Sequence, residues 1–211
     1  VGLQFIRDFY RGTSAYADHV DEELLSYIHL TTKLDEAIIK AAKDGKDIVL
    51  TGNPGDGKTH IIRMLKSKLE HLSTPTVVEL DASTLSNDQI YQAWLAARKK
   101  NAPFVIAINA AVLYSVYNAF PDFEPIKEAY TQMLHAVVFH EEAHESKDLV
   151  VFDLSKREAL TGEILKQAIS KMTAEEHYKE CKKCPLYDSC VVDKNRKMLN
   201  NALFQERLGI I

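Results

Sequence analysis

The sequence predicts an α/β fold in which a parallel sheet lies between two layers of helices. Four short runs rich in β-branched and apolar residues, at 47–51, 76–81, 104–109 and 149–153, alternate with segments whose apolar residues recur at helical spacing. Such alternation is typical of parallel sheets, because parallel neighbours need a crossover connection. The run at 104–109 is apolar enough for both of its faces to be buried, as in a central strand.

Helices are expected around the first two strands. The apolar residues of 34–42 share one helical face, and Gly45 ends this helix just before the first strand. A second amphipathic helix is expected from about residue 61 to residue 72.

The third helix carries a start signal of its own. Ser86 and Gln89 form a capping box that opens a helix running to about residue 99, with the single tryptophan, Trp94, in the core. Pro125 is a favoured first-turn residue and opens the next helix. Later helical segments are therefore expected at 125–139, at 162–173 and from about 194.

Length and composition fit one α/β domain with small appendages. The chain has 211 residues, of which 46% are hydrophobic and 27% charged, so it is globular rather than disordered. We expect an N-terminal helical extension over 1–30, the core over 31–175, and a cysteine-containing helical appendage over 176–211 that continues into a larger protein.

Charge and cysteine content narrow the function class. The net charge of −4 argues against a free-standing nucleic-acid-binding protein, and the basic clusters at 98–100 and 194–197 are interpreted as solvated helix ends. We expect no membrane span, because no apolar run approaches membrane-spanning length, and we expect no signal peptide. Three cysteines bunched near the end are typical of a metal site in a reducing compartment, so a cytoplasmic location is expected.

A glycine-rich loop joins the first strand to its following helix. Residues 52–59 match the phosphate-binding pattern G-x-x-x-x-G-K-[ST] in full, in the strand–loop–helix context that the pattern requires. Backbone N–H groups of such a loop converge on phosphates, and the helix N-terminus adds partial positive charge. Lys58 would reach the β- and γ-phosphates, and the Thr59 hydroxyl would ligate Mg²⁺.

The sequence therefore predicts that this loop binds a nucleoside triphosphate, within a P-loop NTPase fold. His60 follows the motif on the same helix and is counted with the binding segment, although a surface or packing role suits its side chain better than catalysis. The predicted binding residues are Gly52, Asn53, Pro54, Gly55, Asp56, Gly57, Lys58, Thr59 and His60.

The loop and the strand after it carry a family resemblance. The loop together with Val-Glu-Leu-Asp-Ala-Ser at 78–83 resembles AAA+ ATPases, whose clamp loaders carry a similar Glu-Leu-Asn-Ala-Ser strand. With the segments at 107–113, 153–155 and 181–190, the chain resembles bacterial anti-phage defence ATPases of the DptF type, which serve phosphorothioation-dependent DNA restriction. The likeness covers about residues 30–200, and the loop is its most specific part.

This resemblance implies ATP and Mg²⁺ as ligands and a homo-oligomer, a ring or dimer, with nucleotide at the interface. It further implies a protein effector partner or fused effector domain. An interaction with nucleic acid is left open, but not through a basic surface of this chain, and no membrane contact is implied.

The hydrolysis residues depart from the AAA+ pattern. Asn109 lies 57 residues after Gly52, about where the Walker B Asp-Glu pair should end the third strand, but the pair here is Asn109-Ala110. An amide supplies neither negative charge nor a general base. Either Asn109 orients the attacking water while Asp81 or Asp153 holds Mg²⁺, or the Walker B function is degenerate.

Three polar residues end predicted strands, whose carboxyl ends face the nucleotide in such a sheet: Asp81, Asn109 and Asp153. Lys58, Asp81 and Asn109 are the predicted catalytic residues, with Thr59 and Asp81 as Mg²⁺ ligands and Asp153 as the alternative. Helix capping just after a strand is an equal alternative for Asp81 and Asp153. Glu79 is a weaker candidate base.

The cysteine segment predicts a structural metal site. Cys181, Cys184 and Cys190, with His177 four residues before the first, would form a tetrahedral Cys₃His zinc site. An iron–sulfur cluster or free cysteines are the alternatives.

The stretch from His140 to His144 also matches H-E-x-x-H, the zinc metalloprotease signature. We reject a protease, because Glu142 places a charge where such enzymes usually have none and no third ligand follows. A solvated helix end explains the match better.

The leading interpretation is an AAA+-like ATPase module that drives assembly or movement of a larger complex in defence or DNA processing. A nucleotide-gated switch or scaffold with little turnover is the first alternative, favoured by Asn109-Ala110. A P-loop small-molecule kinase is the second, although the segment after the fourth strand offers only Lys156 and Arg157 towards an arginine-rich lid.

Overall fold

The computed structural model describes residues 26–27, 29–72, 76–79, 82–138, 146–156 and 162–208. The chain divides into two compact units, one over 32–157 and the other combining 1–31 with 158–211. The helix at 162–172, which was expected within the core domain, belongs to the second unit in this division.

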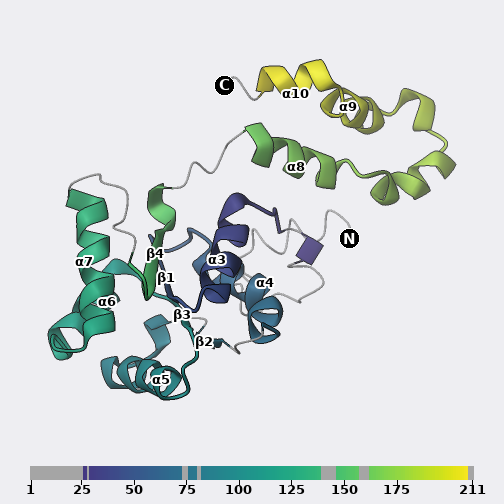
Figure 1. Cartoon of the computed structure of the whole chain (residues 1–211). Helices are drawn as coiled ribbons and strands as arrows, with labels where there is room; N and C mark the ends of the chain where they lie inside the picture. The colour runs from purple at the N-terminus through teal and green to yellow at the C-terminus, as the bar shows by residue number, and fades with distance from the viewer. Residues whose placement is uncertain are drawn as a thin grey trace. The chain divides into compact units, whose positions relative to one another are not determined.

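The first unit is built on a four-stranded parallel sheet with strand order β2-β3-β1-β4 (Figure 1). Ile48 of β1 is in register with Val105 of β3 on one side and Val150 of β4 on the other. Every residue of β1 is buried, as expected of the strand that leads into the loop. The predicted parallel α/β sheet is confirmed, with strands β1 (Asp47–Thr51), β2 (Val77–Glu79), β3 (Phe104–Ala107) and β4 (Leu149–Asp153).

Two layers of helices cover the sheet. Because side chains alternate along a strand, Ile48 and Leu50 pack into one apolar cluster and Val49 into another. The first cluster includes residues of α3 (Lys33–Lys43) and α4 (Lys58–Glu70). The second includes residues of α5 (Asn87–Lys99), α6 (Ala110–Ala119) and α7 (Glu124–Val138).

The capping box predicted for α5 is present. The Ser86 hydroxyl accepts a hydrogen bond from the Gln89 backbone N–H at 3.2 Å, and the Gln89 side chain accepts one from the Ser86 N–H at 2.8 Å. Trp94 of this helix is fully buried, which confirms its predicted place in the core.

One helix was not predicted. The sequence suggested a strand as far as Asn109 and no helix between Asn109 and Pro125, but β3 ends at Ala107 and α6 follows almost at once. Asn109 caps α6, its Oδ1 accepting a hydrogen bond from the Val112 N–H at 2.8 Å. The chain stays apolar from β3 into α6, so the change from strand to helical spacing is not visible in the hydrophobic pattern. Asn109, a favoured N-cap residue, was the signal that could have predicted the start of this helix.

The buried carboxylate of Asp47, the first residue of β1, joins three elements of the first unit. The Asp47 side chain is 5% exposed. Its Oδ2 accepts hydrogen bonds from Trp94 Nε1 at 2.8 Å and Arg98 Nε at 3.1 Å, and its Oδ1 accepts one from the Phe104 backbone N–H at 2.8 Å. These hydrogen bonds tie β1 to α5 and to the start of β3.

The described part of the second unit contains the α-helices α8 (Gly162–Met172), α9 (Val191–Leu199) and α10 (Ala202–Leu208) and two 3₁₀ helices, at Glu175–Lys183 and Tyr187–Ser189. Lys171 of α8 donates hydrogen bonds to the backbone carbonyls of Ser26, Tyr27 and His29. The buried Asp193 of α9 pairs with Arg196 at 3.2 Å and Lys197 at 2.7 Å.

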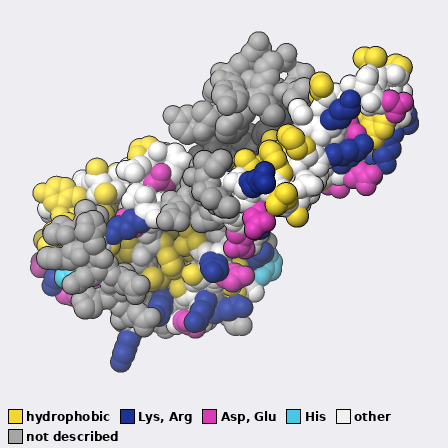
Figure 2. All heavy atoms as spheres, turned by 90° about the horizontal axis from the view of Figure 1, so that it is seen from above, with side chains coloured by type: hydrophobic (Ala, Val, Ile, Leu, Met, Phe, Trp, Pro, Cys, Tyr) yellow, Lys and Arg dark blue, Asp and Glu magenta, His cyan; other side chains and the backbone are white. Residues whose placement is uncertain are grey.

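Acidic and basic side chains are interspersed on the face drawn in Figure 2. Of the helices in the described ranges, none combines the length and the apolar character needed to span a bilayer.

Candidate functional site

The predicted phosphate-binding loop connects the carboxyl end of β1 to the first turn of α4. Its three glycines, Gly52, Gly55 and Gly57, have φ values of +143°, +91° and +85°. Side chains other than hydrogen strain such a backbone, so the loop depends on glycine at these positions. Gly57 is also the N-cap of α4, so the loop ends where that helix begins.

Gly52 is further required by close packing. A Cβ atom built there would lie 2.7 Å from Asp56 Oδ2 and 3.2 Å from both Leu154 Cβ and the Ser155 backbone nitrogen. The first loop residue is therefore pressed between its own loop and the turn after β4.

Hydrogen bonds within the loop hold its shape. Asp56 Oδ2 accepts a hydrogen bond from the Asn53 N–H at 2.6 Å. Lys58 Nζ donates to the carbonyl oxygens of Gly52 at 3.0 Å and Asn53 at 2.8 Å, so its ammonium lies across the loop. Thr59 and His60 are half-buried in the first turn of α4. Of these three residues, Lys58 contacts the loop through its side chain.

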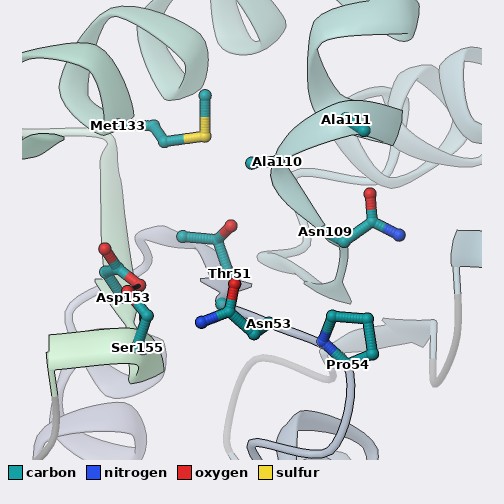
Figure 3. A pocket seen from close by; sticks show the side chains of 10 residues that line it. Thr51, Asn53, Pro54, Asn109, Ala110, Ala111, Met133, Asp153 and Ser155 are labelled. Atoms are coloured by element: carbon teal, nitrogen blue, oxygen red, sulfur yellow. Dashed lines mark hydrogen bonds between the residues drawn. The ribbon is translucent and has the colours of Figure 1, made fainter.

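A pocket of about 470 Å³ lies beside the start of this loop (Figure 3). The structure brings Asn109 and Asp153, two of the predicted strand-end residues, into it together with the first loop residues. Lys58 and Thr59 are not among its lining residues. The lining consists of Thr51, Gly52, Asn53, Pro54, Asn109, Ala110, Ala111, Met133, Asp153 and Ser155.

Both strand-end side chains also make local hydrogen bonds. Asn109 Oδ1 is engaged with the first turn of α6, as described above. Asp153 Oδ1 accepts hydrogen bonds from the Ser155 N–H at 3.0 Å and from the Ser155 hydroxyl at 2.7 Å, stabilising the turn after β4. Each residue thus has a structural role in addition to facing the pocket.

Asp81 lies outside the described residues, as does the side chain of Glu79. The strand that precedes Asp81, β2, is separated from β1 by β3. Asp153 is the last residue of β4, which pairs directly with β1, and it is in register with Thr51.

The predicted zinc ligands all lie in the second unit. Cys181 and Cys190 are half-buried, Cys184 is exposed, and all three are free thiols. His177 Nε2 is hydrogen-bonded to the Tyr27 hydroxyl, whose pKa is raised by burial. Across the ranges that the structure describes, no three His, Cys, Asp or Glu side chains gather closely enough to hold a metal ion. The structure does not bring these four residues together, and zinc remains a prediction.

The H-E-x-x-H segment at 140–144 lies outside the described residues.

Several pocket residues were not anticipated. Thr51 immediately precedes the motif, and its polar side chain at the end of a buried strand was a usable signal. Met133 comes from α7, and nothing in its sequence context indicates that it reaches the loop.

Comparisons with protein-family models, with curated protein sequences and with solved structures find no match to this chain.

Proposed function

We propose that the first unit binds ATP with Mg²⁺ on the loop from Gly52 to Thr59 and hydrolyses it. The observation that supports this most is the position of the loop, between the carboxyl end of the central buried strand and the start of α4. There its backbone N–H groups and the helix N-terminus favour phosphate.

In this proposal Lys58 binds the β- and γ-phosphates. Its ammonium is held by two carbonyl oxygens of the loop, contacts that phosphate oxygens would replace with stronger charge-assisted bonds. Thr59 would hold Mg²⁺ through its hydroxyl, because Mg²⁺ prefers oxygen ligands and keeps several waters. Asp153 would hold it through a carboxylate that faces the pocket. Asp81 remains the other carboxylate proposed for the metal.

Mg²⁺ would neutralise charge that develops on the phosphates. Asn109 would orient the attacking water through its amide, although its Oδ1 is engaged with Val112. That engagement favours the second candidate, a nucleotide-gated switch with little turnover, because an amide oxygen already bonded to a helix is less available to water.

On the family resemblance, we further propose that nucleotide binding drives assembly of a homo-oligomer with nucleotide at its interface. That oligomer would act with a protein effector in anti-phage defence or DNA restriction. The second unit, with its cysteine segment, is the proposed contact with neighbouring parts of that complex.

ATP binding and turnover by the wild-type protein and by Lys58→Ala test the proposal. Lys66 lies on the same helix, pairs with Glu70 and is 42% exposed, so Lys66→Ala is the matched control. We expect Lys58→Ala to weaken ATP binding at least about tenfold, the equivalent of one charge-assisted hydrogen bond, and Lys66→Ala to leave it unchanged.

If Lys58→Ala binds ATP as tightly as the wild type, the loop is not the site. If the wild type binds ATP tightly but does not hydrolyse it, the protein is a nucleotide-gated switch rather than an ATPase.

A further inference from the structure

The hydroxyl of Thr51 is a buried polar group with no partner. Thr51 is 2% exposed, and its Oγ1 has no hydrogen-bond partner in the part of the chain that the structure describes. Leaving a buried hydroxyl unpaired costs about 1–3 kcal/mol, so each such group calls for an explanation. Thr51 lines the pocket, and Figure 3 shows its hydroxyl on the side that faces Ala110 and Asn109.

The N-terminus of α6 opens into the same pocket. The first backbone N–H groups of a helix have no partner within the helix, and Ala110 and Ala111, the first two residues of α6, line the pocket. The third, that of Val112, is taken by Asn109 Oδ1. The positive end of the helix dipole therefore lies at the pocket, with the N–H groups of Ala110 and Ala111 unused by the helix itself, an arrangement that favours an anion.

Asp153 sets where in the pocket an anion would lie. Figure 3 shows Asp153 and Asn109 on opposite sides of the pocket. The Asp153 carboxylate repels an anion, so the α6 side is the favoured place.

The pocket covers only part of the phosphate-binding loop predicted at 52–59. It takes only the first three loop residues into its lining and excludes Lys58. Its volume of about 470 Å³ lies within the range typical of small-molecule sites.

We propose that this pocket binds an oxyanion, a phosphate or carboxylate group, on the N–H groups of Ala110 and Ala111 with the Thr51 hydroxyl as a third donor. The inference goes beyond the proposed function, because all three donors lie outside the loop from Gly52 to Thr59. Two sources supply the same chemistry: the terminal phosphate of a bound triphosphate, or a separate small anionic molecule.

Inorganic phosphate is the first probe, titrated without divalent cations into protein labelled with ¹⁵N-alanine and ¹⁵N-glycine. The backbone amides of Ala110 and Ala111 report on the pocket, and those of Gly55 and Gly57 report on the loop. We expect saturable shifts at Ala110 and Ala111 in the wild type.

Thr51→Val keeps the side-chain shape and removes only the hydroxyl, and Thr51→Ser keeps the hydroxyl. We expect Thr51→Val to weaken the phosphate response at Ala111 about tenfold and Thr51→Ser to stay within about threefold of the wild type. Removing the unpaired hydroxyl should not impair folding, so a weaker response would not reflect unfolding.

Ala110→Pro removes one donor at the first helical position, where proline is well tolerated. The backbone of Asn109, at φ −84° and ψ 160°, suits a following proline. This variant should weaken phosphate binding at Ala111, whereas Lys33→Pro, at the first position of α3, should not. Asp153→Asn should strengthen it.

Titrations with ADP and with a non-hydrolysable ATP analogue, each with Mg²⁺, identify the source of the bound oxyanion. If the analogue but not ADP occupies the pocket and blocks phosphate, the terminal phosphate is the ligand. If phosphate still binds beside the saturating analogue, the ligand is a separate molecule.

Either outcome supports the subsite. It is overturned if Ala110 and Ala111 respond to none of these probes, or if Thr51→Val responds to phosphate like the wild type. Failure of the proposed function would look different: nucleotide would leave Gly55 and Gly57 unmoved while phosphate still shifted Ala111.

Discussion

Replacing Asp47 tests the polar anchor at the start of β1. Asp47 accepts hydrogen bonds from Trp94, from Arg98 and from the Phe104 backbone, and so ties β1 to α5 and β3. Trp94 and Phe104 are fully buried, whereas the Arg98 side chain is 41% exposed. Asp47→Ala would therefore leave two buried donors, Trp94 Nε1 and the Phe104 N–H, without a partner, while the Arg98 guanidinium would hydrogen-bond to water instead.

The size of the effect follows from those two donors. Each costs about 1–3 kcal/mol when left unsatisfied, and the exposed Arg98 adds at most about 1 kcal/mol. We expect Asp47→Ala to lower the free energy of unfolding by about 2–6 kcal/mol, the sum for two unsatisfied buried donors. Asp47→Asn keeps one acceptor oxygen and should cost less, so it provides a measurable variant if the alanine protein does not fold.

The assay is equilibrium unfolding in urea, followed by fluorescence. Trp94 is the single tryptophan of the chain and lies within the first unit, so its emission reports on that unit. Asp148→Ala removes an exposed carboxylate from a residue whose backbone carbonyl accepts a hydrogen bond from the Asp47 N–H, so it is the matched control and should change stability by less than about 0.5 kcal/mol. A loss below about 1 kcal/mol for Asp47→Ala would refute the reasoning, because water would then satisfy both donors.

Three further outcomes are expected. Asn109→Ala should destabilise the first unit by about 1 kcal/mol because the α6 cap is lost, whereas Asn109→Ser should keep the cap and the stability. ATPase assays of both variants then separate the capping role of Asn109 from its proposed role in orienting water. Gly52→Ala should weaken ATP binding in a titration, because its Cβ would displace Asp56, and unchanged binding would contradict this. Below about pH 4 the second unit should lose stability as Asp193 protonates, because its hydrogen bond with Lys197 lowers the pKa of Asp193; Asp193→Asn should flatten that dependence in circular dichroism.

Local sequence signals account for much of the first unit. β1 and β4 have the predicted bounds, because short β-branched runs flanked by polar residues are distinctive. The helix α5 has the predicted capping box. By contrast α6 was missed, because an apolar stretch that passes from a buried strand into a buried helix face changes period without a change in composition.

The candidate site likewise has one part that the sequence predicts, the loop, and one part that only the tertiary structure reveals, the pocket. The loop from Gly52 to Thr59 is contiguous, and its chemistry depends on residue types at fixed spacing, so the chain alone predicts it. The pocket is not contiguous: it joins Thr51, the start of α6, Met133 and Asp153, which lie up to about 100 positions apart. That grouping follows from strand order, because placing β3 and β4 on either side of β1 brings their ends to the loop, and pairing between distant strands leaves no local trace in the sequence.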